Sequence, residues 1–182
     1  AGPAVLAASY LLLNFLRFGD AFEFGHNYLP EFVRAPQGQF SLSYFWENAA
    51  NLLRLPRWQG DTQPLDFPLT NGMAFWLVNP LLPVAAAAWG WAVRKKRREH
   101  PLLLWMLPPL VLAYIFVLCC HRTLGGWQFG DRYLLDVMPW IFCGLVLWKP
   151  KDPRFGNVCV PLFALGAAVN FAGTIQVYSL WS

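Results

Sequence analysis

Residues 121–133 combine positive charge with glycine, and their side chains are of types that bind phosphate. The stretch contains Arg122 and Arg132 together with His121. Arginine has a planar guanidinium that donates two parallel hydrogen bonds to a phosphate or carboxylate. The stretch is therefore a candidate anion site, with Arg132 as its main ligand and with His121 and Arg122 adding charge at the other end.

Three glycines and two aromatic residues shape the same stretch. A backbone without a Cβ atom lets amide groups approach a ligand closely, and glycine also adopts turn conformations that other residues avoid. The residues expected to shape the loop are Gly125, Gly126, Trp127, Gly130 and Tyr133.

A structural role for Arg132 is the competing interpretation. Asp136 lies one helical turn further on, and Asp131 is adjacent. An ion pair between Arg132 and Asp136 would neutralise a carboxylate at the start of an apolar run. The two interpretations are compatible, since one arginine can serve both roles. For His121, an ordinary surface or hydrogen-bonded histidine is the alternative.

Acidic residues in the long polar stretch 17–71 form a second candidate set. Asp20 and Glu23 could act as a general base or as metal ligands, and Glu23 lies between two phenylalanines in a glycine-bounded turn. Solvated charge and loop-stabilising hydrogen bonds are the alternatives. No pair has metal-ligand spacing, so we predict no metal site; a divalent cation stays open as a cofactor. No nucleotide-binding loop, zinc motif or Ser-His-Asp pattern occurs.

The composition is that of a membrane protein. Apolar residues make up 57% of the chain and charged residues 13%, with ten tryptophans and a mean hydropathy of +0.37. Soluble domains have about a quarter charged residues. The net charge is +4, but the basic residues are clustered at the ends of apolar runs, so the charge does not indicate a nucleic-acid partner. The four cysteines lack metal-site spacing, and buried, unreactive thiols are expected.

Apolar runs predict an all-α, multi-pass transmembrane helix bundle that forms a single membrane domain. We expect spans at about 3–16, 72–93, 101–120, 134–148 and 158–180. A helix over 3–16 would cover about 21 Å, less than the roughly 30 Å of a bilayer core. We therefore expect a spanning helix whose start precedes residue 1. Pro80 and Pro83 should kink the second span.

Basic residues in the short loops predict the orientation. Five occur at 94–98, and three more occur between 149 and 154. By the positive-inside rule the loops 94–100 and 149–157 are cytoplasmic. The loops 17–71 and 121–133 and the C-terminus then lie outside an inner (plasma) membrane.

Residues 39–55 predict an amphipathic helix at the membrane surface or against the bundle. Apolar residues recur there at helical spacing. The inward residues are expected to be Phe40, Tyr44, Phe45, Leu52 and Leu53. Ser43, Glu47, Asn51 and Arg54 fall mostly on the other face. Pro64, Pro68 and the turn signal Asn71-Gly72 predict an irregular stretch after it. In the fifth span, Asn170 and Gln176 are expected to be interhelical hydrogen-bond partners.

Two phrases in this sequence resemble a known family. They are Asn14-x-x-Arg17-Phe18-Gly19 with Phe22-Glu23-Phe24-Gly25, and Gly125-Gly126-Trp127-x-Phe129-Gly130-x-Arg132-Tyr133-Leu134. They look like bacterial cell-envelope glycosyltransferases of the GT-C type, similar to polyprenyl-phosphate-dependent mannosyl and arabinosyl transferases. The resemblance implies a C-terminal portion of such an enzyme, which moves a hexosyl or pentosyl group from a polyprenyl-phosphate donor to an acceptor on the outer face.

The same resemblance implies where catalysis and donor binding occur. The catalytic acidic residue of the family lies in its first outer loop, which is expected upstream of residue 1. Residues near the lipid phosphate are expected among Arg132, His121 and Arg122. The implied partners are the bilayer and the lipid-linked sugar, while the sugar, the acceptor and the oligomeric state are left open.

A transporter or a non-catalytic membrane scaffold is the alternative function. Transport favours ionisable residues near the midplane of the membrane and internal repeats. This sequence has no visible repeat, and its charges lie at the ends of apolar runs. The glycosyltransferase interpretation is therefore favoured.

Overall fold

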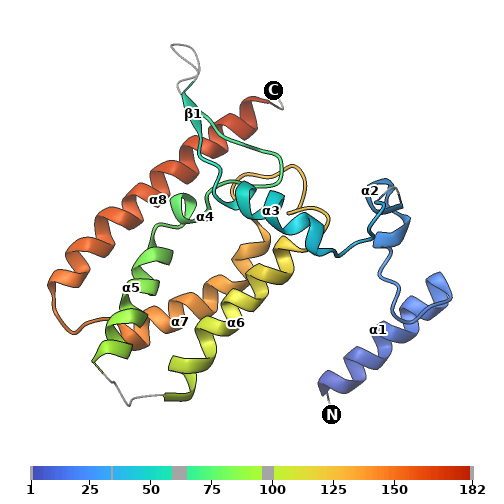
Figure 1. Ribbon diagram of the computed structural model, residues 1–182, viewed down its shortest axis with the longest axis horizontal. Coiled ribbons are helices and arrows are strands. Elements are labelled where there is room, and N and C mark those ends of the chain that lie inside the picture. The colour runs from blue at the N-terminus through green and yellow to red at the C-terminus, as the bar shows by residue number, and fades with distance from the viewer. Residues whose placement is uncertain (1, 34, 59–64, 96–100, 181–182) are drawn as a thin grey trace. The chain divides into compact units, whose positions relative to one another are not determined.

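The computed structural model describes the chain except residues 1, 34, 59–64, 96–100 and 181–182 (Figure 1). The chain divides into two compact units, Ala1–Leu42 and Ser43–Ser182, and each is described by itself. The described part is mostly helical, which confirms the predicted helical class. Most of the predicted loop 94–100 lies outside the described residues.

The first unit is built around one apolar helix. Helix α1 (Gly2–Phe18) is followed by a 3-10 turn, η1 (His26–Tyr28), and a short helix, α2 (Pro30–Val33). Asn14 is the buried residue of α1, and its side-chain amide donates to the carbonyl of Ala21 at 3.3 Å. This contact ties the chain that leaves α1 back onto the helix.

Four helices of the second unit pack together (Figure 1). They are α5 (Leu81–Arg94), α6 (Pro101–Cys119), α7 (Met138–Trp148) and α8 (Arg154–Ser179). Helix α7 contacts both α5 and α6, and α8 contacts α5. The core between them includes Ala88 and Ala92 of α5, where small side chains allow close helix contact.

Two described helices are long and apolar enough to cross a membrane. They are Pro101–Cys120, with a mean hydropathy of 2.4, and Arg154–Ser179, with 1.9. About 20 helical residues cover a bilayer core of roughly 30 Å. The apolar helices Gly2–Phe18 and Tyr133–Trp148 are shorter.

The predicted span 72–93 is broken into two helices, where only a kink was expected. Helix α4 (Phe75–Val78) ends at Val78, with Asn79 as its C-cap, and α5 begins at Leu81. Pro80 between them has no backbone N–H, so it cannot continue the hydrogen-bond ladder. Pro83 falls in the first turn of α5, where a missing N–H costs no helix bond.

The last two predicted spans, 134–148 and 158–180, differ from the structure at their starts, because the α-helix of the fourth begins only at Met138 and that of the fifth begins already at Arg154. A 3-10 turn, η3 (Tyr133–Val137), leads into α7. Helix α8 begins at Arg154, after Pro153 at the N-cap, and Oδ1 of Asp152 accepts a hydrogen bond from the Arg154 backbone N–H at 2.9 Å. The connection predicted to span 149–157 is therefore shorter. Cys143 on α7 is exposed, contrary to the expectation that all four thiols are buried.

The predicted amphipathic helix is shorter than 39–55 and buries a different face. The structure has a 3-10 turn, η2 (Leu42–Tyr44), followed by α3 (Phe45–Leu52). Tyr44 is buried as predicted, but Phe40 and Leu53 are exposed. Phe45 and Leu52 are half-buried and Glu47 is exposed, as predicted, but Asn48 and Asn51 are also buried, so the predicted inward face is only partly right.

Hydrogen bonding to another helix explains the burial of Asn48. The Asn48 side-chain amide donates to the carbonyls of Cys119 at 3.0 Å and His121 at 2.7 Å. The carbonyl of Cys119 lies at the C-terminal end of α6, where backbone acceptors have no partner within the helix, and that of His121 lies two residues beyond. The amide of Asn48 therefore faces inward, because it hydrogen-bonds backbone acceptors at the end of α6.

A small antiparallel pair of strands interrupts the otherwise helical chain. Strand β1 (Arg57–Trp58) pairs with β2 (Leu65–Asp66), and Arg57 lies opposite Asp66. Two-residue strands are too short to give an alternating pattern in the sequence. The all-α prediction therefore missed them.

Two glycines of α8 provide space for neighbouring segments. A Cβ atom on Gly166 would lie 2.7 Å from Cδ of Pro80, and one on Gly173 would overlap the Phe129 ring. Between them, the Asn170 amide donates to the carbonyls of Val78 at 2.9 Å and Gly166 at 2.7 Å. Small residues and one amide thus fix α8 against α4.

Candidate phosphate-binding loop

Residues 121–133 are hydrogen-bonded along one side to residues 69–73. The backbone N–H of Gln128 donates to the carbonyl of Leu69 at 2.6 Å, and the backbone N–H of Asn71 donates to the carbonyl of Gly126 at 2.8 Å. The Met73 amide donates to the carbonyl of Gly130 at 3.2 Å. These backbone hydrogen bonds to residues 69–73 fix the conformation of the loop.

Gln128 holds the loop together from within. It is buried, and its side-chain amide donates to the carbonyl of Leu124 at 2.5 Å. Its side-chain oxygen accepts a hydrogen bond from the backbone N–H of Arg132 at 3.1 Å. Sequence reasoning missed Gln128; the available signal was one amide side chain among glycines and aromatics.

The loop glycines differ in their surroundings. Gly125, Gly126 and Gly130 all have positive φ, which favours glycine. A Cβ atom on Gly125 would lie 2.9 Å from the Tyr133 ring, and one on Gly130 would touch Val78. A Cβ atom on Gly126 would meet nothing within 4 Å. Gly125 therefore serves the packing of the loop itself and Gly130 serves its contact with α4, whereas Gly126 is the one of the three with open space.

Asp131 is the buried carboxylate of the loop. It is 2% exposed, and Oδ1 accepts hydrogen bonds from the amides of Tyr133 at 3.1 Å and Leu134 at 3.3 Å. Oδ2 is buried and has no hydrogen-bond partner among the described residues. Burial raises the pKa of Asp131 to about 6, although the two amides and Arg132 oppose the increase. Its burial keeps this carboxylate away from a substrate.

Arg132 is exposed at the start of η3. Its guanidinium carbon lies 5.2 Å from the centre of the Tyr133 ring. Oδ2 of Asp136, the expected ion-pair partner of Arg132, instead accepts a hydrogen bond from the hydroxyl of Tyr114 at 3.1 Å. Within the described ranges Arg132 forms no ion pair with Asp136, so the predicted pair is absent. The guanidinium donors of Arg132 are thus available to an anion.

His121 and Arg122 begin the loop in different surroundings. Nδ1 of His121 lies 2.6 Å from the carbonyl oxygen of Thr123 and 3.3 Å from the backbone nitrogen of the same residue. The Arg122 guanidinium lies 5.4 Å from the centre of the Tyr44 ring. Its Nε is buried without a hydrogen-bond acceptor in the described part of the chain. The two arginines therefore stack on different tyrosines.

Asp20 and Glu23 organise the turn after α1 in the first unit. Oδ1 of Asp20 accepts a hydrogen bond from the amide of Phe22 at 2.9 Å. Glu23 accepts one from the amide of Gly25 at 2.7 Å and another from the Asn27 side chain at 2.6 Å. The Asn27 contact lowers the pKa of Glu23. Both carboxylates are therefore used in local turn structure.

Over the ranges that the structure describes, no three or more His, Cys, Asp and Glu residues are grouped to hold a metal ion. No protein family, curated protein or solved structure matches this chain.

Proposed function

We propose that this chain is part of an integral-membrane glycosyltransferase. The enzyme moves a sugar from a polyprenyl phosphate to an acceptor on the outer face of the membrane, and Arg132 contacts the donor phosphate. The observation that carries the proposal is the exposed guanidinium of Arg132 on a fixed loop. Its backbone is held by Gln128, and its side chain lies against Tyr133.

The chemistry of sugar transfer gives such an arginine a function. The bond between the anomeric carbon and the phosphate oxygen breaks, and the acceptor oxygen bonds to that carbon while losing its proton to a base. The leaving polyprenyl phosphate gains one negative charge. A guanidinium at this phosphate therefore binds the transition state more strongly than the ground state.

Arg122 supports an anion site at the other end of the loop. A buried N–H donor without an acceptor costs about 1–3 kcal/mol, so such groups are uncommon in folded proteins. Nε of Arg122 is such a donor among the described residues. Because this Nε is shielded in the structure, a phosphate oxygen of the donor lipid would satisfy it only after the side chains around Arg122 move aside.

The polar residues of α8 favour this proposal over the transporter alternative. The Asn170 amide binds the carbonyls of Val78 and Gly166. Gln176 accepts a hydrogen bond from the amide of Phe67 at 2.9 Å and donates to Asp66 at 3.1 Å. Both side chains are used in packing α8, which leaves them unsuited to bind a transported solute.

The membrane arrangement is part of the same proposal. Five spans place the basic loops 94–100 and 149–157 in the cytoplasm, with 17–71, 121–133 and the C-terminus outside. The two helices of sufficient length, Pro101–Cys120 and Arg154–Ser179, support membrane insertion of the chain.

The test compares Arg132→Lys and Arg132→Ala in the full-length protein. Lysine keeps the charge and loses the paired donors, so we expect kcat/KM for the lipid donor to fall about ten- to a hundredfold, the equivalent of one charge-assisted interaction. Arg132→Ala should reduce it further. Arg57→Lys, on β1, is the matched control and should leave kcat/KM unchanged.

A double variant separates donor binding from a structural role. Because Arg132 and Asp136 are not paired, Arg132→Ala with Asp136→Ala should be as inactive as Arg132→Ala alone. Thermal stability in detergent shows whether each variant is folded. A folded double variant with normal dependence on donor concentration would remove Arg132 from the donor site.

A further inference from the structure

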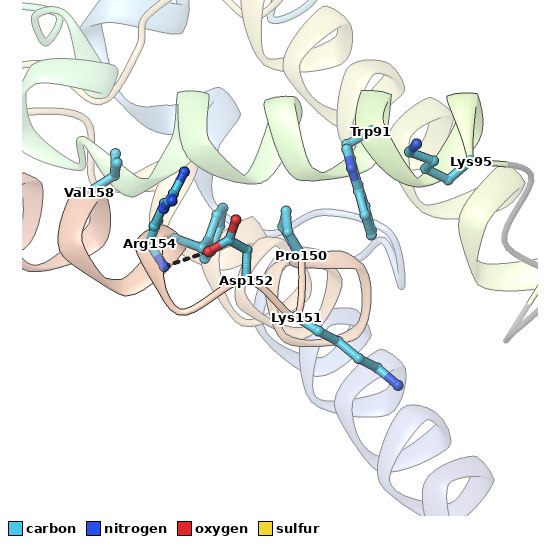
Figure 2. Close-up of a pocket in the computed structure, with 8 residues that line it drawn as sticks. Trp91, Lys95, Pro150, Lys151, Asp152, Arg154 and Val158 are labelled. Carbon is cyan, nitrogen blue, oxygen red and sulfur yellow. Dashed lines mark hydrogen bonds between the residues drawn. The ribbon is translucent and has the colours of Figure 1, made fainter.

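A groove of about 880 Å³ lies where the end of α5 meets the start of α8 (Figure 2). Lys95, Lys151 and Arg154 line it, together with one carboxylate, Asp152. Three cations against one carboxylate leave an excess of positive charge. In the described part of the chain, none of these three cations forms an ion pair. The groove is therefore suited to an anion.

The carboxylate of Asp152 already has a structural function. Its Oδ1 accepts the hydrogen bond from the backbone N–H of Arg154, and its carbonyl accepts one from the amide of Phe155 at 3.0 Å. Asp152 and Arg154 point toward α5, whereas the Lys151 side chain extends away from them (Figure 2). Since the first amides of α8 are occupied, an anion here must be bound by side chains, chiefly those of Lys95 and Arg154.

The rest of the groove is apolar. Trp91 and Phe155 are half-buried in its wall, and Val158 is exposed one turn further along α8. The groove lies at the first turns of α8, one of the two helices long enough to cross a bilayer. Tryptophan is enriched at membrane–water interfaces. A cationic end thus adjoins an apolar wall at the expected depth of lipid headgroups.

We propose that this groove binds an anionic phospholipid from the membrane. Lys95 and Arg154 bind the headgroup phosphate, and an acyl chain lies along Val158. Basic pockets between helix ends bind anionic lipid headgroups in this way. The apolar wall at a helix that can span a bilayer favours a lipid over a soluble phosphate. The site is independent of sugar transfer, since it lies away from the loop 121–133.

The experiment measures lipid binding to the full chain by native mass spectrometry from mixed micelles. Phosphatidylglycerol is titrated against phosphatidylcholine, which has no net charge. We expect Lys95→Gln with Arg154→Gln to weaken phosphatidylglycerol binding about 25-fold, from about fivefold per cation near a membrane surface. Lys95→Gln alone should weaken it about fivefold, which covers the case in which the double variant does not fold.

The matched control removes the same charge outside the groove. Arg94→Gln with Lys149→Gln changes two exposed cations that do not line it, and should leave binding within about twofold of the unsubstituted chain. An equal loss in this control would show general surface attraction and overturn the groove. Equal binding of phosphatidylcholine would overturn the charge requirement. Displacement of the lipid by millimolar inorganic phosphate would overturn the assignment to a lipid.

Discussion

Replacing Asp131 by asparagine should stabilise this protein above neutral pH and bring no benefit in acid. The pKa of Asp131 is raised from 3.8 to about 6 by burial. A carboxyl whose folded pKa is raised contributes stability below its unfolded pKa, and that stability is lost as the pH rises through the folded pKa. The ionised Asp131 therefore destabilises the fold, and the cost is largest above about pH 7.

The size of the effect follows from the difference between the folded and unfolded pKa of Asp131. At about 1.4 kcal/mol per pKa unit, the difference gives an upper limit of about 3 kcal/mol at pH 8. An asparagine at this position keeps an oxygen to accept the amides of Tyr133 and Leu134, but places an unpartnered N–H where Oδ2 lies, which costs about 1 kcal/mol. We expect a net gain of about 1–2 kcal/mol, or about 2–8 °C in melting temperature for a chain of this size.

The assay is thermal unfolding in detergent at pH 5, 6, 7 and 8. The difference in melting temperature between Asp131→Asn and the unsubstituted chain should grow over this range. Asp152→Asn is the control, because this exposed carboxylate also accepts a backbone amide at the start of a helix. Its difference from the unsubstituted chain should stay constant. A difference for Asp131→Asn that is the same at pH 5 and pH 8 would refute the reasoning.

Three further predictions concern packing and topology. Gly173→Ala forces the Phe129 ring to move and should cost about 1–3 kcal/mol of unfolding free energy, measured by denaturant titration; Gly90→Ala, where a Cβ meets nothing within 4 Å, should cost nothing. Asn48→Asp removes the donor to two carbonyls and should destabilise more than Asn48→Ala, because it buries a charge beside them; equal melting temperatures would contradict this. In a chain without native cysteines, Lys151→Cys should stay unlabelled by an impermeant reagent in intact cells; strong labelling would reverse the proposed orientation.

The sequence predicted the long helices because their signal is local. The run 101–120 is apolar throughout, so it appears in the structure as one helix despite two internal prolines. The break at Asn79 and Pro80 was predicted only as a kink. Proline removes one hydrogen-bond donor whether a helix is kinked or broken. The complete separation of α4 from α5 is accompanied by packing of Gly166 of α8 against Pro80.

The inward face of α3 and the interior of the loop depend on contacts distant in sequence. Asn48 is buried because its side-chain amide donates to two carbonyls at and just beyond the end of α6, and no periodicity within α3 contains that information. Gln128 and Asp131 were likewise not singled out, although both are buried and hold the loop. The sequence did indicate Arg132, because an exposed arginine beside glycines is recognisable from residue types alone.

The contact between Phe129 and Gly173 sets the position of α8 along and around its own axis. Each residue of a helix advances about 1.5 Å and turns about 100°. Sliding or turning α8 by one residue would present Ala172 or Thr174 to the ring, and each carries the Cβ atom that Gly173 lacks. The loop between α6 and α7 therefore fixes the axial and rotational position of α8. A shift of this loop must either break the contact with Gly173 or move α8 with it.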